Sequence, residues 1–342
     1  MNASLINEFF DQINHHIYTN LHSVLIVRNN KLVVEEYFPG TEPVIPQTLY
    51  GSRSRMSKRE SFTRYRYRVE YNRDTLHTLQ SATKSVNSIL IGIAIDQHLI
   101  HGVDEKISTF FPEFTGKDGI RLKHFLSMTA GLDWNENKIP YTDPRNDCIR
   151  MNRTNDPVRF LLERPAVAAP GTKFVYNSAI AVALGEIIRK VSGMPVDKFA
   201  ERNLFKPLGI SDYAWKGNFT NGVIHTGGGL YLRPRDMAKI GCMMLNNGRW
   251  QGKQIVSEDW VRESTKKQAS DMRYGYEWWL SQFKVRDQMI PSFLAEGYGG
   301  QCISVFPSLH MVVVFTGWNE GHFSGQLRDM MQRYILPAAI RN

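Results

Sequence analysis

The chain has 342 residues, 42% of them hydrophobic, which is enough apolar material for one large domain or two closely packed subdomains. Its 26 glycines and 15 prolines are ordinary numbers and no repeat of fixed period is present, which excludes a solenoid and a disordered chain. The 42 lysines and arginines exceed the 33 aspartates and glutamates, and the resulting net charge of +9 identifies no partner by itself.

Motifs of several other protein classes are missing from the sequence. Cys148, Cys242 and Cys302 are far apart and odd in number, so they predict neither a disulfide framework nor a metal site. The histidines lack metal-ligand spacing of the HExxH kind, and we expect no metal and no organic cofactor. No apolar run is long enough to cross a bilayer.

The first residues contain no basic segment followed by an apolar run, so they do not resemble a signal peptide. We therefore expect a cytoplasmic protein if Met1 is the natural start. A periplasmic or secreted protein is expected if a leader has been removed.

The N-terminal segment predicts a helix and a β-hairpin. Residues 5–17 are amphipathic with a helical period. Residues 23–38 then form two apolar runs on either side of Arg28-Asn29-Asn30-Lys31, a turn-forming sequence. The hairpin is expected to belong to a sheet that the helix covers.

Residues 53–73 hold much of the excess positive charge. Arginine alternates with tyrosine or valine over 64–69, and this period of two predicts a strand with one basic and one aromatic face. A basic and aromatic stripe is one feature of nucleic-acid-binding proteins. Because no helix-turn-helix, zinc-finger or RNA-binding signature accompanies it, we interpret it as a solvated hairpin face and expect no nucleic-acid partner.

The tetrad Ser81-Ala82-Thr83-Lys84 stands at the head of a segment, 86–95, that is apolar on nearly all sides and therefore predicts a buried helix. A serine and a lysine three positions apart share one helix face and can touch. Burial favours the neutral form of a lysine, so Lys84 is expected to act as a base that activates Ser81 as a nucleophile. The helix N-terminus would also favour negative charge developing near Ser81.

The rest of the chain predicts more helices and a second hairpin. Residues 178–191 have a clear helical period and precede Gly193, a typical helix stop. Two strands at 302–306 and 311–318 flank a turn, and an amphipathic helix is expected at 324–336.

These elements predict an α/β (α+β) fold, with an antiparallel sheet built from both chain ends and flanked by helices. We divide the single domain 1–342 into an α/β subdomain, 1–100 and 235–342, and a mostly helical subdomain, 101–234. No flexible linker separates them, so a shared interface is expected.

Further stretches accompany the SxxK tetrad in order along the chain: LSMTAGLDWNE at 126–136, PGTKFVYNSA at 170–179, GGGLYLRPRDMAKIG at 227–241 and GYGGQ at 297–301. With them, the region from about 76 to 318 resembles the serine β-lactamase and penicillin-binding-protein superfamily. It is most similar to the class C-like esterases and 6-aminohexanoate-dimer hydrolases. The resemblance implies a β-lactamase/transpeptidase-like fold and no cofactor.

In that superfamily the second element is Tyr-x-Asn, whose tyrosine helps to move protons between serine, lysine and leaving group. The matching residues are Tyr176-Asn177-Ser178, with Ser178 in place of the final asparagine. The resemblance therefore implies a catalytic Tyr176 and a substrate-binding Ser178.

The third element is Lys-Thr-Gly or His-Thr-Gly on the strand beside the nucleophile. His225-Thr226-Gly227 has these letters but precedes a glycine run and a helix-like segment, so we assign the role to Tyr298-Gly299-Gly300 at the start of the C-terminal hairpin. By this alignment the backbone N–H groups of Ser81 and Gln301 form an oxyanion hole. His225 remains a candidate for the cleft wall or a structural histidine; the loop 133–136 is likewise a cleft wall or a packed loop.

The predicted function is that of a serine hydrolase acting on a small-molecule ester, amide or lactam through an acyl-enzyme. A phenol at Tyr298 cannot pair with a substrate carboxylate as lysine does, which favours an ester or a small amide. The alternatives are a β-lactamase or D-alanyl-D-alanine carboxypeptidase, and a non-catalytic binding protein on the same scaffold. No GxSxG elbow supports an α/β-hydrolase. The sequence carries no signal for an oligomeric state.

Overall fold

The computed structural model describes residues 1–43, 66–319 and 323–340, and within them the main feature is an antiparallel sheet of six strands. In spatial order the strands are β10 (Trp279–Val285), β11 (Gln288–Gly297), β12 (Gln301–Phe306), β13 (Met311–Gly317), β1 (Leu21–Arg28) and β2 (Lys31–Tyr37). Both predicted hairpins are present, and β1 pairs with β13, so the prediction of one sheet built from both ends of the chain is confirmed.

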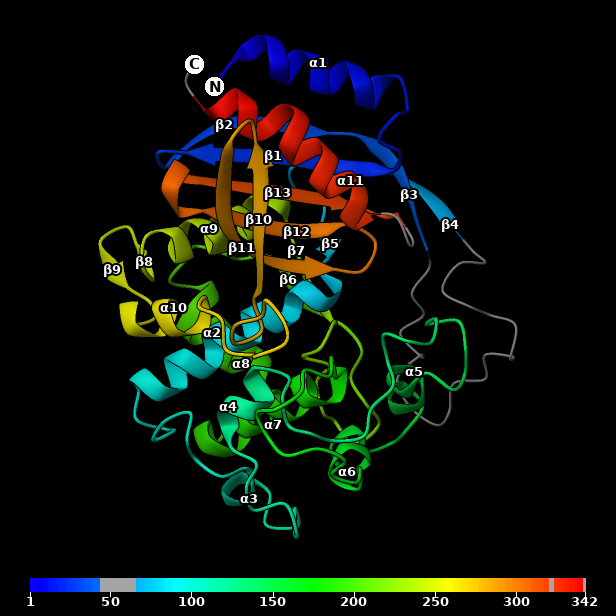
Figure 1. The fold of residues 1–342 in the computed structure, drawn as a ribbon, viewed down its shortest axis with the longest axis vertical. Coiled ribbons are helices and arrows are strands. Elements are labelled where there is room, and N and C mark those ends of the chain that lie inside the picture. Colours follow the sequence, from blue (N-terminus) through cyan, green and yellow to red (C-terminus); the bar gives the residue numbers. More distant parts are fainter. Residues whose placement is uncertain (44–65, 320–322, 341–342) are drawn as a thin grey trace.

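Helices cover both faces of this sheet (Figure 1). The helices from the two chain ends lie on one face: α1 (Ala3–Asn14), α11 (Phe323–Met330), the π-helical turn η5 (Met331–Ile335) and α12 (Leu336–Ala339). On the other face lie α9 (Pro234–Leu245) and, deeper in the molecule, α2 (Thr83–Asp96). Val24 and Ile26 pack under the terminal helices, whereas Leu25 and Val27 belong to the core on the α9 side. Because both faces are buried, the central strands read as continuous apolar runs.

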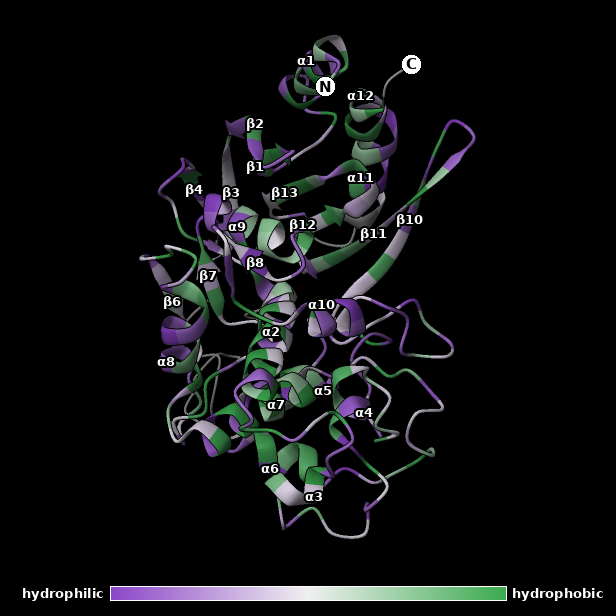
Figure 2. Cartoon of the chain, turned by 90° about the vertical axis from the view of Figure 1, so that its left-hand side faces the viewer, coloured by the Kyte–Doolittle hydropathy of each residue, from purple (hydrophilic) through white to green (hydrophobic). Residues whose placement is uncertain are grey.

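The region below the sheet in Figure 1 is mainly helical. Its helices are α3 (Ile107–Phe110), α4 (Leu122–Leu126), α5 (Asp147–Asn152), α6 (Pro157–Leu162), α7 (Ser178–Ser192), α8 (Val196–Ala200), the π-helical turn η3 (Glu201–Phe205) and α10 (Glu258–Ser264). The predicted helix at 178–191 is α7, and Gly193 ends it in the left-handed conformation at φ 71°. Figure 2 shows hydrophobic residues along α2 and α7, which pack against each other in the core. The subdomain boundaries at 100 and 235 stay a prediction.

Short strands make three small sheets in the described ranges. They are β3 (Pro39–Pro43) with β4 (Arg66–Glu70), β5 (His77–Thr78) with β7 (Leu230–Leu232) and β6 (Tyr213–Trp215), and β8 (Arg249–Trp250) with β9 (Lys253–Gln254). In β4, Arg66, Tyr67 and Arg68 are exposed, which agrees with a solvated hairpin face. Val69 of the predicted alternation also belongs to β4, and residues 64 and 65 lie outside the described residues.

Over the same ranges, no helix is both long and apolar enough to span a membrane.

One glycine sets how closely α9 approaches the sheet. A Cβ atom at Gly241 would lie 2.5 Å from Val312 Cγ1 and 2.8 Å from Ile303 Cγ2, closer than carbon atoms pack. We expect Gly241→Ala to lower the free energy of unfolding by about 1–2 kcal/mol, since overpacking outweighs the better helix propensity of alanine. Urea denaturation measures this.

The matched control is Gly325→Ala in α11, where, apart from its neighbours in the helix, no atom of the described residues lies within 4 Å of the added carbon. Here alanine should stabilise the protein by up to about 1 kcal/mol. Equal effects of the two substitutions would contradict the packing argument.

Candidate active site

Ser81 lies in the single turn η2 (Gln80–Ala82) that leads into α2. Gln80 directly before it has φ 46°, a left-handed conformation that costs a residue other than glycine about 1–3 kcal/mol. The end of β11 packs closely on this segment, because a Cβ atom at Gly297 would lie 2.1 Å from Leu79 O. The nucleophile candidate thus lies on strained backbone that the β11–β12 hairpin packs against.

The ammonium group of Lys84 lies next to the hydroxyl group of Ser81. Nζ donates a hydrogen bond to Ser81 Oγ at 3.1 Å and another to Gly227 O at 2.7 Å, and the side chain is 1% exposed. The His225-Thr226-Gly227 segment is a loop and not a strand, as predicted. Its Gly227 carbonyl nevertheless belongs to the site, a contact that the sequence analysis missed.

Tyr176 completes this group from the loop before α7. Asn177 caps that helix, since its side chain accepts hydrogen bonds from Ala179 N and Ile180 N, and this fixes the preceding tyrosine. The Tyr176 ring is buried, stacks on Trp279 at 5.7 Å and has its centre 4.9 Å from Lys84 Nζ. Tyr176 therefore meets Ser81 and Lys84, which lie far from it in the sequence, in one cluster.

The electrostatics of this cluster set the resting charge of Lys84. Burial alone would lower the pKa of Lys84, but Tyr176 and Glu136 together outweigh burial and raise that pKa above its ordinary value. Burial also raises the pKa of the Tyr176 phenol, although Lys84 opposes it. In the resting protein Lys84 is thus a cation beside a neutral Tyr176, and the neutral Lys84 that the predicted mechanism requires for attack on the substrate stays a prediction.

A small cleft of about 60 Å³ opens above Ser81. Its described lining residues are Gln80, Ser81, Glu136, Tyr141, Cys148, Ile149, Asn152, Ser178, His225, Gly227, Gly228, Tyr298 and Trp318. The structure therefore brings the predicted residues Ser178, His225 and Tyr298 together with Ser81, above Lys84 and Tyr176.

The turn Tyr298–Gly300 enters β12 at Gln301, where the sequence analysis places the third element. Gly299 and Gly300 adopt φ values of 93° and 125°, and Gly299 packs on Trp318. The Gln301 side chain points into the fold, where its Nε2 donates to Gly317 O at 2.9 Å. Gly299, Gly300 and Gln301 are not among the lining residues, and the oxyanion role of the Gln301 N–H stays a prediction.

Glu136 is the main residue whose importance the sequence did not indicate. It is 2% exposed and its carboxylate accepts four hydrogen bonds, two of them from Ser178. The Ser178 hydroxyl is therefore engaged within the protein, and its role in substrate binding stays a prediction. Of the two interpretations of the loop 133–136, the cleft wall holds for Glu136.

His225 is a buried member of the cleft. Its Nε2 lies 3.1 Å from Asn152 Oδ1, and its ring stacks on Phe219 at 5.6 Å. Burial, reinforced by the charge of Lys84, lowers the pKa of His225 to about 3, so it is neutral at physiological pH.

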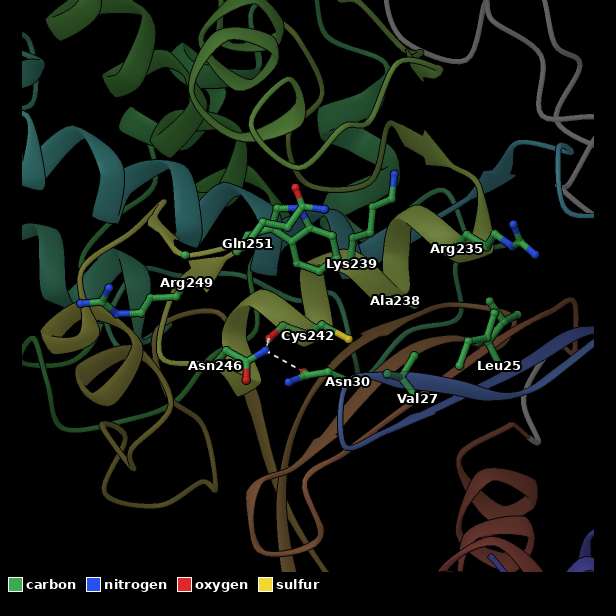
Figure 3. Close-up of a pocket in the computed structure, with 13 residues that line it drawn as sticks. Leu25, Val27, Asn30, Arg235, Ala238, Lys239, Cys242, Asn246, Arg249 and Gln251 are labelled. Atoms are coloured by element: carbon green, nitrogen blue, oxygen red, sulfur yellow. Dashed lines mark hydrogen bonds between the residues drawn. The ribbon is translucent and has the colours of Figure 1, made fainter.

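A larger cavity, of about 730 Å³, lies between α9 and the β1–β2 hairpin. Figure 3 shows Leu25 and Val27 from β1 facing Cys242 of α9, with arginines at its margin. Burial raises the pKa of the Cys242 thiol to about 11, so this sulfur is not an activated nucleophile. No serine or tyrosine is among the described residues that line the larger cavity, so it has no counterpart of the Ser81, Lys84 and Tyr176 cluster.

In the part of the chain that the structure describes, no group of three or more histidine, cysteine or acidic residues could hold a metal ion. Cys148, Cys242 and Cys302 are all buried free thiols.

A family model described as "Beta-lactamase" matches residues 22–329. The chain belongs to the beta-lactamase family. This match confirms the predicted membership of the β-lactamase and penicillin-binding-protein superfamily, and it confirms the predicted fold class. The protein is a hydrolase of this type, with a small molecule as substrate.

The individual relatives found by comparison have low sequence identity to this chain. The "Putative D-alanyl-D-alanine carboxypeptidase" of Salmonella paratyphi B is 23% identical over 313 residues, covering 73% of this chain and 71% of its own. Among solved structures, the "Putative 6-aminohexanoate-dimer hydrolase from Bacillus anthracis" has a TM-score of 0.70 at 19% identity and covers 95% of this chain and 82% of its own. "EstCE1, a hydrolase with promiscuous acyltransferase activity" has a TM-score of 0.66 at 16% identity, covering 96% and 97%. These neighbours share the fold of the beta-lactamase family.

The buried neutral histidines predict how the stability of this beta-lactamase-family protein depends on pH. Burial lowers the pKa of His225 to about 3 and that of His22 to about 2, whereas an unfolded histidine titrates near 6.5. Below pH 6.5 these histidines bind protons in the unfolded chain but not in the folded protein, so their contribution to stability falls as pH falls. We expect a loss of about 1 kcal/mol per pH unit for each such histidine between pH 6.5 and 4.5, measured by urea denaturation.

His225→Gln should remove one of these contributions and flatten the slope over that window. An unchanged slope would show that His225 already binds a proton in the folded protein.

Proposed function

We propose that the protein is a serine hydrolase that cleaves an ester or a small amide through an acyl-enzyme on Ser81. The observation that carries this proposal is the 3.1 Å hydrogen bond between Lys84 Nζ and Ser81 Oγ, buried at the base of a cleft and beside Tyr176. A buried lysine is costly to keep unless its position serves a purpose, and contact with a serine hydroxyl is the arrangement that nucleophilic catalysis requires.

Because Lys84 is a cation at rest, the attacking form of the enzyme has one proton less on the Lys84–Tyr176 pair. The two groups interact strongly, so this proton belongs to the pair and not to one residue. In that form the pair accepts the Ser81 proton as Oγ bonds to the substrate carbonyl carbon. The backbone N–H groups of Ser81 and Gln301 hold the oxyanion, and each such donor typically lowers the barrier by about 3 kcal/mol.

The tetrahedral intermediate then collapses to the acyl-enzyme. The bond from carbon to the leaving alcohol or amine breaks, and Tyr176 returns the proton to the departing oxygen or nitrogen. In the second half, the same pair removes a proton from a water molecule that attacks the acyl carbon. The acid leaves, and Ser81 regains its hydrogen.

The lining of the cleft supports a substrate without an obligatory carboxylate. No lysine or arginine is among its described lining residues, and the position of the family's cationic third motif holds the phenol of Tyr298. The second candidate is a D-alanyl-D-alanine carboxypeptidase or β-lactamase, which the name of the Salmonella relative favours. We expect turnover of p-nitrophenyl butyrate and little turnover of a chromogenic cephalosporin; the reverse would favour the second candidate.

The assignment of the nucleophile predicts the effect of Ser81→Ala. This variant should lose labelling by a fluorophosphonate probe, and its ester hydrolysis should fall by roughly 10⁴-fold or more, because no acyl-enzyme can form. Labelling is followed by intact-protein mass spectrometry. Ser178→Ala is the matched control, since it removes another cleft hydroxyl and should still be labelled. Continued labelling of the Ser81→Ala protein would refute the assignment.

The raised pKa values of Lys84 and Tyr176 predict a rate that increases with pH. Both shifts disfavour loss of the proton, so the reactive form is scarce at neutral pH and should become about tenfold more abundant per pH unit in the alkaline range. We expect kcat/KM for a p-nitrophenyl ester, corrected for spontaneous hydrolysis, to rise from pH 7 to 9. A flat profile would contradict a protonated resting pair.

A further inference from the structure

The larger cavity lies where the six-stranded sheet extends past the helix that covers it. Helix α9 packs mainly on β13, β12 and β1, whereas β2 continues the sheet beyond β1. Leu32 of β2 lies directly opposite Val27 of β1, and opposite residues on neighbouring strands point to the same face. Both side chains line the cavity, and Leu32 is 42% exposed. Part of the apolar sheet face therefore borders open space.

The middle of this cavity has apolar walls. Ala238 and Cys242 are one helical turn apart, so they share the face of α9 that borders the cavity. Leu25 and Val27 of β1 face them across the gap (Figure 3), and Trp250 of β8 adds an aromatic wall. The volume of about 730 Å³ lies within the range of about 300–1,000 Å³ that is typical of small-molecule sites. The small side chains at positions 238 and 242 leave room for an apolar ligand.

Polar contacts hold the walls together near both ends of α9. At its C-terminal end, Asn246 Nδ2 donates a hydrogen bond of 3.0 Å to Asn30 Oδ1 in the turn between β1 and β2 (Figure 3). At its N-terminal end, Arg235 donates two hydrogen bonds, of 2.5 and 2.6 Å, to the carboxylate of Glu35 in β2. The cavity is therefore an apolar space between two fixed contacts.

The charged residues of this cavity are all cations. Arg235, Lys239 and Arg249 line it, and no acidic residue is among its described lining residues. Arg235 is already paired with Glu35, and Lys239 Nζ lies 2.8 Å from Asp236 Oδ1. Arg249 is exposed and forms no ion pair with any residue in the described ranges. One positive charge at the margin of the cavity is thus uncompensated.

The cationic groups lie around the rim of the cavity. In Figure 3 the charged ends of Arg235, Lys239 and Arg249 point away from Cys242 and from the space between α9 and β1. Long cationic side chains commonly line an apolar surface with their methylene stems and keep the charge in water. An anion bound at the rim would therefore keep most of its hydration while an attached apolar group enters the cavity.

We propose that this cavity binds the anion of a medium-chain fatty acid, with its alkyl chain between α9 and the β1–β2 hairpin and its carboxylate at Arg249. The apolar walls match the chain, and the single uncompensated cation matches the single negative charge of the head group. No described residue lines both this cavity and the Ser81 cleft, so the two sites are separate. The proposal goes beyond the hydrolase function and does not depend on it.

The test is a calorimetric titration of the full chain with hexanoate, octanoate and decanoate. We expect one saturable site, with an affinity that rises by up to about fourfold for each added methylene group that becomes buried. Decanol and decyltrimethylammonium have the same chain but a neutral or cationic head, and should bind at least about threefold more weakly than decanoate. Absence of saturable decanoate binding, or equal affinity for all three head groups, would overturn the proposal.

Variants then assign the ligand to this cavity. Ala238→Leu fills the space between α9 and β1 and should weaken decanoate binding by at least about tenfold. Arg249→Gln, at an exposed position where folding is not at risk, should lower the affinity for decanoate to that for decanol and leave decanol binding unchanged. The matched control is Arg153→Gln, which removes an exposed arginine that lines neither cavity and should keep the wild-type affinity. Wild-type affinity in both Ala238→Leu and Arg249→Gln would overturn the proposal.

A final titration separates this cavity from the Ser81 cleft, because a hydrolase also releases a carboxylic acid in its own active site. Protein whose Ser81 carries the fluorophosphonate label should bind decanoate with unchanged affinity. Loss of binding on labelling would place the fatty acid in the cleft and overturn the proposal. A protein that is not labelled at all would contradict the serine-hydrolase function, but the chain-length series and the Ala238→Leu and Arg249→Gln variants would still decide the fatty-acid site.

Discussion

The ammonium group of Lys84 is the constraint around which the centre of this protein is organised. A buried cation in a core helix destabilises the fold unless hydrogen-bond acceptors and negative charge surround it. Ser81 Oγ and Gly227 O supply the acceptors, and Glu136 supplies the charge. Each comes from a different part of the chain, so the need to compensate one buried charge links α2, the loop after β6, and the segment before α5.

The same compensation gives the site its chemistry. The charge that stabilises Lys84 as a cation also keeps the proton on the Lys84–Tyr176 pair, and the pair must release this proton before it can act as a base. The interactions that stabilise the resting protein therefore lower the fraction of the protein that is in the reactive, deprotonated form. Such opposition between stability and reactivity is common at catalytic centres, where a strained or buried group is held in place by its surroundings.

Glu136 connects the electrostatics of the base with the shape of the cleft. Tyr176 and, to a smaller extent, Glu136 raise the pKa of Lys84, and the Glu136 carboxylate also accepts hydrogen bonds from the hydroxyls of Tyr141 and Ser178. In the related Tyr-x-Asn element an asparagine offers both a donor and an acceptor. A serine whose hydrogen is taken by a neighbouring carboxylate offers only an acceptor. The serine at position 178 and its contact with Glu136 thus belong together, and only the structure shows the contact.

Local sequence pattern alone predicted the two hairpins, the terminal helices and α7 with its stop at Gly193. It also predicted the contact between Ser81 and Lys84. These features depend on helical or strand periods, or on side chains three positions apart, and therefore on only a few neighbouring residues. Tyr176 required a family resemblance, since 95 residues separate it from Ser81. Only the tertiary structure decided the charge of Lys84 and the roles of Glu136 and the Gly227 carbonyl. A pKa and a hydrogen-bond direction depend on which groups from distant segments surround an atom, and no local pattern encodes that.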